Sequence, residues 1–174
     1  MRVLPLAATV LVAALTLTAC SDDGDGAGDA GKTAKNEKAA CSLGELTVQV
    51  GPANAAPAAG DSGNLPITLT NDSGAACTIE GLPSVTLGTT AVAADPSAKA
   101  GTTTLTKGAT TSFAVSYVRG EQGGDGSLAV TEGTFGLPGS DETHGFTWSY
   151  GEIASKSDGK TPDASVTGFQ QTGD

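Results

Sequence analysis

The chain has 174 residues, with 9 basic and 19 acidic side chains, and its formal net charge is −10. Nucleic acids and anionic lipid surfaces are bound by basic patches, so this balance argues against a nucleic-acid partner and against docking flat on a membrane. One histidine and one methionine, the initiator, are too few soft ligands for a copper or zinc site. We therefore expect no metal site and no cofactor.

The first predicted element is an export signal. Arg2 is followed by residues 3–19, which carry no charge. This run falls short of the roughly 20 apolar residues of a spanning helix and contains Pro5. The segment from Leu17 to Cys20 resembles a bacterial lipobox, which implies that residues 1–19 are removed and that Cys20 receives the lipid. An uncleaved anchor, or secretion with a chance cysteine, are the alternatives.

Residues 20–40 are predicted to be the lipidated cysteine and an acidic, Gly/Ala-rich tether. From Ser21 to Ala40 no hydrophobic side chain is larger than alanine, and such a segment cannot bury enough apolar surface to offset its ordering entropy. The sequence therefore predicts a protein that is anchored by its lipid to the extracytoplasmic face of the cell membrane.

The cysteine count supports the same interpretation. There are three cysteines, Cys20, Cys41 and Cys77. An odd number in an exported protein leaves one cysteine that cannot form a disulfide within the chain. If Cys20 carries lipid, Cys41 and Cys77 can form a disulfide, which an exported compartment permits. Two buried free thiols are the alternative.

Residues 41–174 are predicted to form one all-β domain. About seven short runs alternate apolar and polar residues and are separated by turn residues, as in antiparallel sheets with one wet face. Two such sheets stack into a sandwich. Pro66 lies within one run and predicts an edge strand there. The runs are 46–50, 65–70, 84–87, 113–117, 128–130, 146–150 and a weaker 164–169.

The segment 65–87 resembles the actinobacterial "domain of unknown function 4232" family of secreted proteins and lipoproteins. A second similar stretch is 105–117, and Cys41 matches the family's early cysteine. The resemblance implies an immunoglobulin-like antiparallel β-sandwich and no established activity. Many members carry a further cysteine pair nearer the C-terminus, which this chain lacks. The matching residues of the first segment are Thr70, Asn71, Gly74, Cys77, Thr78, Gly81 and Pro83.

One row of aromatic residues, His144, Phe146, Trp148 and Tyr150, recurs at period two and so shares one strand face. Such a row can bind a sugar or a partner chain. It can equally be the core face of a central strand, which is the interpretation that we favour. No other binding residues are predicted.

We expect a non-catalytic binding or structural module, with an envelope glycan or protein as its partner. Ser62 lies in "GDSGN", which is similar to a serine-protease motif, but the one histidine follows it in the chain, against that family's order. Two alternatives stay open. One is a glycan hydrolase that uses loop carboxylates such as Glu132, Asp141 and Glu142, and the other is a calcium-stabilised adhesion module.

Overall fold

A computed structural model describes residues 38–54 and 56–171. The predicted all-β class is confirmed: within these residues the chain forms strands and one short 3-10 turn, η1 (Leu43–Glu45). Seven strands have five or more residues, and the other eight have two to four. The predicted signal peptide, Cys20 and most of the predicted tether lie outside the described residues.

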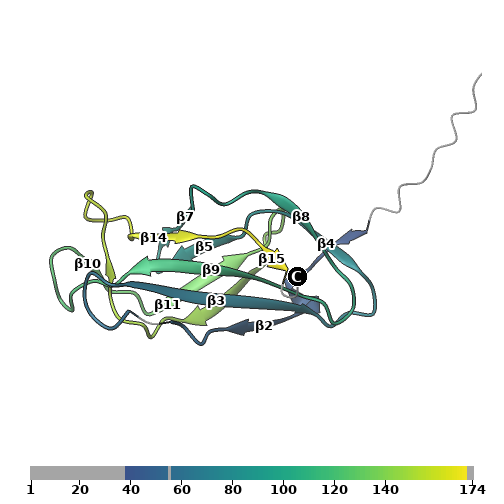
Figure 1. Cartoon of the computed structure of the whole chain (residues 1–174), viewed down its shortest axis with the longest axis horizontal. Helices are drawn as coiled ribbons and strands as arrows, with labels where there is room; N and C mark the ends of the chain where they lie inside the picture. The colour runs from purple at the N-terminus through teal and green to yellow at the C-terminus, as the bar shows by residue number, and fades with distance from the viewer. Residues whose placement is uncertain (1–37, 55, 172–174) are drawn as a thin grey trace, which may run out of the picture. The chain divides into compact units, whose positions relative to one another are not determined.

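The larger sheet is built around its two longest strands, which lie side by side (Figure 1). β3 (Ser62–Asn71) and β9 (Thr110–Val118) pair antiparallel along all of β9, with Ile67 opposite Phe113. Both strands alternate buried and half-buried residues, as the period-two runs predict. The sheet order is β2 (Leu46–Val50), β3, β9, β14 (Ala164–Val166) and β7 (Ala93–Ala94), and β15 (Gln170–Gln171) also pairs with β9.

A second sheet covers the apolar face of the first. Its order is β12 (Thr143–Thr147), β11 (Glu132–Gly136), β5 (Ser84–Leu87) and β6 (Thr90–Ala91). Phe113 of β9 meets Phe135 of β11 edge to face, with ring centroids 5.3 Å apart. The buried residues of both sheets belong to one hydrophobic core, so the fold is β-sandwich-like. An immunoglobulin-like strand order stays a prediction.

Two smaller sheets complete the domain. β1 (Ala39–Ala40) pairs in parallel with β4 (Cys77–Gly81), which pairs antiparallel with β8 (Gly101–Leu105). β10 (Ser127–Leu128) pairs with β13 (Ile153–Ala154). Across residues 38–54 and 56–171, no helix has the length and apolar character that crossing a bilayer requires.

The edge position predicted from Pro66 is wrong, because β3 lies between β2 and β9. The β2–β3 ladder ends at the pair Val50 and Ile67, and Pro66 is the next residue of β3 beyond this pair. Ala114 of β9 lies opposite Pro66. The N–H and the carbonyl of Ala114 both bond to Thr167, on the side of β9 that faces away from β3. The missing N–H of Pro66 therefore faces the end of β2, where the Pro66 carbonyl accepts from the N–H of Gly51 at 2.8 Å, so an interior strand loses at most one ladder bond there.

Candidate functional site

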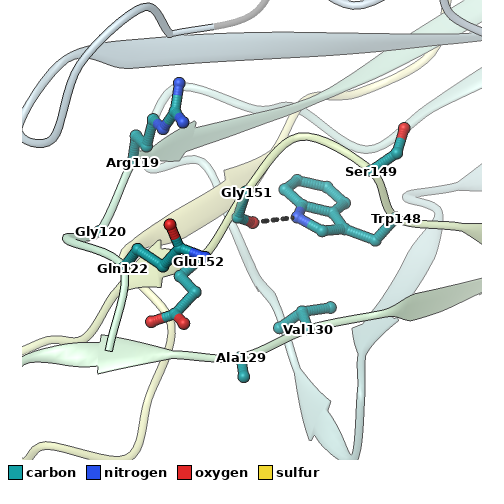
Figure 2. Close-up of a pocket in the computed structure, with 9 residues that line it drawn as sticks. All are labelled: Arg119, Gly120, Gln122, Ala129, Val130, Trp148, Ser149, Gly151 and Glu152. Atoms are coloured by element: carbon teal, nitrogen blue, oxygen red, sulfur yellow. Dashed lines mark hydrogen bonds between the residues drawn. The ribbon is translucent and has the colours of Figure 1, made fainter. Parts of the chain in front are cut away.

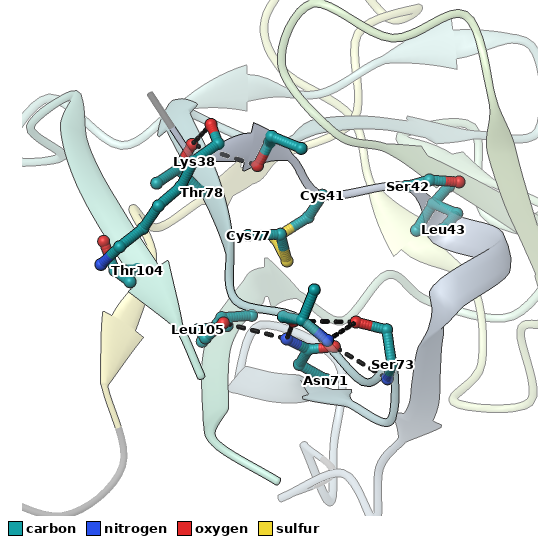
Figure 3. Close-up of a disulfide and its surroundings, with 12 residues drawn as sticks. Lys38, Cys41, Ser42, Leu43, Asn71, Ser73, Cys77, Thr78, Thr104 and Leu105 are labelled. Carbon is teal, nitrogen blue, oxygen red and sulfur yellow. Dashed lines mark hydrogen bonds between the residues drawn. A yellow bond between two sulfur atoms is a disulfide. The ribbon is translucent and has the colours of Figure 1, made fainter. Parts of the chain in front are cut away.

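The predicted disulfide is present between Cys41 and Cys77, whose Cα atoms are 4.9 Å apart (Figure 3). Both cysteines are buried in the hydrophobic core. The main-chain N–H of Cys41 donates to the carbonyl of Thr78 at 2.9 Å and continues the β1–β4 pairing. The disulfide thus joins the first described strand to β4.

Some of the residues that carry the family resemblance lie close to this disulfide (Figure 3). Asn71 is fully buried, and its Nδ2 donates to the carbonyls of Ala75 and Leu105, both at 2.9 Å. Gly81 has φ +120°, and a Cβ there would lie 3.1 Å from Pro138 Cβ, so a larger residue would be strained. These motif residues build the corner of the fold, and their contacts explain their residue types without a ligand.

The aromatic row divides between the core and its margin. Phe146 and Trp148 are 8% and 4% exposed, whereas His144 and Tyr150 are half-buried. β12 ends at Thr147, so Trp148 and Tyr150 lie in the loop that follows. The core interpretation is confirmed for Phe146 and Trp148, but the central strand that it assumed is wrong, because β12 is the edge strand of its sheet. Binding by this row as a whole stays a prediction.

Trp148 is held by its neighbours on several sides. Its Nε1–H donates to the carbonyl of Gly151 at 2.7 Å. The rings of Tyr117 and Tyr150 meet it edge to face, with centroid distances of 4.8 and 5.1 Å. An indole packed in this way presents an edge rather than an open face, so it offers little surface on which a sugar ring could stack.

Trp148 is also one wall of a cavity of about 320 Å³, which Figure 2 shows. Three segments meet there: the chain after β9, the chain after β10 and the loop between β12 and β13. The side chains combine one cation, one carboxylate, one amide and a small apolar surface. The lining residues are Arg119, Gly120, Gln122, Ala129, Val130, Trp148, Ser149, Gly151 and Glu152.

One positively and one negatively charged side chain line this cavity, and each is held in place by hydrogen bonds to main-chain groups. Arg119 is half-buried, and its Nη1 donates to the carbonyls of Ala56 and Pro57 at 2.8 and 3.1 Å. Glu152 is half-buried, and its Oε1 accepts from the N–H of Gly123 at 3.1 Å. The hydrogen bonds of both groups therefore go to neutral main-chain groups and not to each other.

The sequence did not identify Arg119, although a signal was available. On β9, Phe113, Val115 and Tyr117 are buried at alternate positions, and the next residue on that side of the chain is Arg119. It forms an isolated bridge with Ile153, so the strand geometry extends this far. A charged residue at the next alternate position after a row of buried apolar residues indicates where the hydrophobic core ends.

Three further cavities, of about 270, 440 and 280 Å³, lie at the surface. The first includes Asp95, whose pKa is lowered by the hydrogen bonds that it accepts from the hydroxyl and the N–H of Ser97. The second lies between Glu45 and Asp72, and the Asp72 carboxylate accepts a hydrogen bond from the Thr47 hydroxyl. None of the four cavities is lined by Glu132, Asp141 or Glu142.

The three carboxylates of the hydrolase alternative are exposed, and Glu132 lies at one end of a hairpin whose other end carries the consecutive residues Asp141 and Glu142. Glu132 pairs with Thr147 at one end of β11, and Gly136 pairs with Thr143 at the other, beside Glu142. Four strand steps separate the two ends by about 13 Å. Glu142 accepts hydrogen bonds from Ser42 Oγ at 2.9 Å and from the N–H of Leu43 at 3.0 Å, which fastens this loop to η1.

The residues of the protease-like motif lie in different sheets. Ser62 begins β3 of the larger sheet, whereas His144 lies in β12 of the second sheet and stacks at a tilt on Phe135. Within the part of the chain that the structure describes, no three His, Cys, Asp or Glu side chains are arranged to hold a metal ion.

The fold and its corner define a class of domain: an all-β, sandwich-like domain with one disulfide and a buried asparagine beside it. A family profile described as "Domain of unknown function (DUF4232)" matches residues 41–170, which is most of the chain. The chain belongs to this family, which confirms the resemblance drawn from the 65–87 segment. No curated protein and no solved structure shows a significant match to the chain.

Proposed function

We propose that this protein is an exported lipoprotein whose β-sandwich domain is a non-catalytic binding module on the outer face of the cell membrane. The observation that carries the proposal is the Cys41–Cys77 disulfide. A disulfide of this kind is typical of proteins that fold outside the reducing cytosol. It uses two of the three cysteines, and Cys20 is the third, at the lipobox-like position.

A binding role fits the arrangement of side chains better than catalysis. The hydrolase alternative needs two carboxylates about 5–10 Å apart in one concave site. Glu132 is instead separated from Asp141 and Glu142 along the β11–β12 hairpin, and the adjacent pair Asp141 and Glu142 is exposed and lines none of the four cavities. The cavity beside Trp148 has the size of a small-molecule site, for which volumes of about 300 Å³ and more are usual.

The anchoring is tested in a bacterial host that processes lipoproteins, with a clickable palmitate analogue. We expect label on the wild-type protein and its recovery in the membrane fraction, because two or more acyl chains hold a protein firmly. Cys20→Ser should carry no label and should be recovered in the soluble fraction. Ser21→Ala, a neighbouring change that keeps the thiol, should behave like wild type. A labelled or membrane-bound Cys20→Ser protein would overturn the anchoring.

A further inference from the structure

One edge of the larger sheet carries an inference about a partner. Within the described residues, β2 is the outermost strand of that sheet, beside β3 (Figure 1). We infer that this edge pairs with the same edge of a second copy of the chain. The two β2 strands run antiparallel and are centred on Val48, so that the two larger sheets join into one. This inference goes beyond the binding role proposed above and does not rest on it.

The hydrogen bonds at the two ends of β2 show which of its main-chain groups are available to a partner. The N–H of Gly51 donates to the carbonyl of Pro66 at 2.8 Å, and the N–H of Asp72 donates to the carbonyl of Glu45 at 3.3 Å. Bonded pairs alternate along an antiparallel ladder, so the odd-numbered residues of β2 are the ones that bond to β3. The residues whose N–H and C=O groups point away from β3 are Leu46, Val48 and Val50.

The sequence of β2 contains none of the features that keep edge strands from pairing. Natural proteins protect such edges with lysine or proline, with bulges, or by making the strand very short. β2 has five residues, with no charged side chain, no proline and no bulge in its ladder with β3. The strand at the opposite edge, β7, has only two residues. β2 is therefore the edge at which the larger sheet can be extended.

The available groups of β2 are self-complementary about Val48. In the antiparallel pair, the two Val48 residues lie opposite each other and exchange two main-chain hydrogen bonds. The N–H of Val50 then meets the carbonyl of Leu46 in the other copy, whereas the N–H of Leu46 already donates to the carbonyl of Leu43. Val48 and Val50 are half-buried at the margin of the core. Pairing therefore also covers apolar side chains that solvent partly reaches.

The distribution of charge favours a second copy in this orientation. Glu45 and Asp72 lie at one end of β2, and the strand itself is uncharged. A parallel pair would bring the acidic ends of the two copies together. The antiparallel pair separates the two Glu45 residues by six strand steps, or about 20 Å, which exceeds the Debye length of about 8 Å at physiological ionic strength. A second copy thus matches this edge in hydrogen bonding, side chains and charge.

The first test is cysteine cross-linking in the exported chain that carries Cys20→Ser, whose other two cysteines form the disulfide. We expect Val48→Cys to cross-link to a second copy under a mild oxidant, because the opposed Cα atoms lie about 5.5 Å apart. Val50→Cys, at another half-buried valine of β2, is the matched control. Its two copies lie four strand steps, or about 13 Å, apart along the joint, so its yield should be at least about fivefold lower.

The second test places charges on the outer face of β2. Thr47 and Gln49 are exposed, and each lies opposite the other across the joint. Thr47→Lys/Gln49→Glu sets opposite charges against each other, whereas Thr47→Lys/Gln49→Lys sets like charges. We expect the first double variant to dimerise about tenfold more tightly, as measured by sedimentation at up to millimolar protein. Net charge alone would favour the second, which neutralises more of the chain's charge of −10.

A joint made by one short strand is smaller than a standard interface, so we expect the wild-type chain to exchange between monomer and dimer as its concentration changes. Thermal melting shows whether each variant is folded, and the charge variants carry the test if a cysteine variant is not.

Four results would overturn the inference. One is a wild-type chain that stays monomeric at millimolar concentration, with no cross-link through Val48→Cys. The second is an equal yield for Val48→Cys and Val50→Cys, and the third is equal dimerisation of the two charge variants. The fourth is a Val48→Cys chain that cross-links in cells only to other proteins, which would assign the edge to a different partner. None of these results bears on the lipid labelling of Cys20.

Discussion

The side chain of Asn71, which has no exposed surface, donates a 2.9 Å hydrogen bond from Nδ2 to the main-chain carbonyl of Leu105. The same nitrogen donates to the carbonyl of Ala75, and Oδ1 accepts from the N–H of Ser73 at 2.9 Å. The main-chain groups of Asn71 bond to Ala109 and Gly108. One residue therefore ties the turn after β3 to the turn between β8 and β9.

Replacing this asparagine should be costly. Asn71→Ala removes three hydrogen bonds and leaves the buried carbonyl of Leu105 without its Nδ2 donor, so we expect a loss of about 2–4 kcal/mol in the free energy of unfolding. Guanidinium denaturation measures it. Asn54→Ala, at an exposed asparagine, is the matched control and should change stability by less than about 0.5 kcal/mol. Equal effects of the two changes would contradict the role assigned to Asn71.

Removing the disulfide should destabilise the domain by about 4 kcal/mol on the loop-entropy model, because the bond closes a loop with a sequence separation of 36. The double variant Cys41→Ser/Cys77→Ser, made in the Cys20→Ser background, should match the reduced parent protein in denaturant. Alkylation of the unreduced, denatured parent should find no thiol. Two reactive thiols would contradict the bond.

The buried indole gives a third prediction. Trp148 is the only tryptophan, so its emission should be blue-shifted and weakly quenched by iodide. Trp148→Ala should cost about 3–5 kcal/mol. Trp148→Phe, which keeps an aromatic ring but loses the bond to Gly151, should cost about 1–2 kcal/mol. A readily quenched tryptophan in a folded domain would show that this part of the row is surface.

A glycine beneath Tyr117 gives a fourth prediction. Gly63 is paired with Tyr117 across β3 and β9, and a Cβ at Gly63 would come within 2.6 Å of the tyrosine hydroxyl oxygen. Gly63→Ala must displace a fully packed ring, so we expect a loss of about 1–3 kcal/mol. Gly145→Ala, also in a strand but with open space around it, should be close to neutral. Thermal melting of both variants compares them.

The loop between β13 and β14 should carry an unusually acidic carboxyl group. Asp158 accepts hydrogen bonds from the hydroxyl and the N–H of Thr161 and from the N–H of Lys160, and these lower its pKa to about 2. Because the folded pKa is depressed, the stabilisation is present above the unfolded pKa and is lost as the pH falls toward 2. An NMR titration should show this midpoint, and Thr161→Val should raise it. A wild-type midpoint of about 4 would contradict the prediction.

The alternation of apolar and polar residues predicted the strands whose two faces differ, because the larger sheet has one buried face and one more exposed face. It predicted β3 and β9 well and missed β4, β8 and β11. In β8, Thr102, Thr103 and Thr104 give no apolar contrast. It also could not specify which strands pair, since the Ile67–Phe113 register joins residues far apart in the chain. The Pro66 expectation failed because β2 ends beside the proline, so an interior strand loses at most one ladder bond there.

The site was less predictable than the fold. Period two placed Phe146 and Trp148 correctly on the core side, but it could not show that the strand ends between them. The cavity is formed by three loops, and its charges come from Arg119 and Glu152, which belong to no motif. Only folding brings these two residues together.

The position of the disulfide has a mechanical consequence for a protein held at its N-terminus. If the chain is tethered at Cys20, tension enters the domain at Cys41 and crosses the sulfur–sulfur bond to Cys77. Residues 42–76, including all of β2 and β3, lie inside this covalent loop and cannot be peeled away from the N-terminal end. Pulling on the oxidised protein should therefore extend it by less than the full chain length, and a reductant should release the hidden length in one additional step.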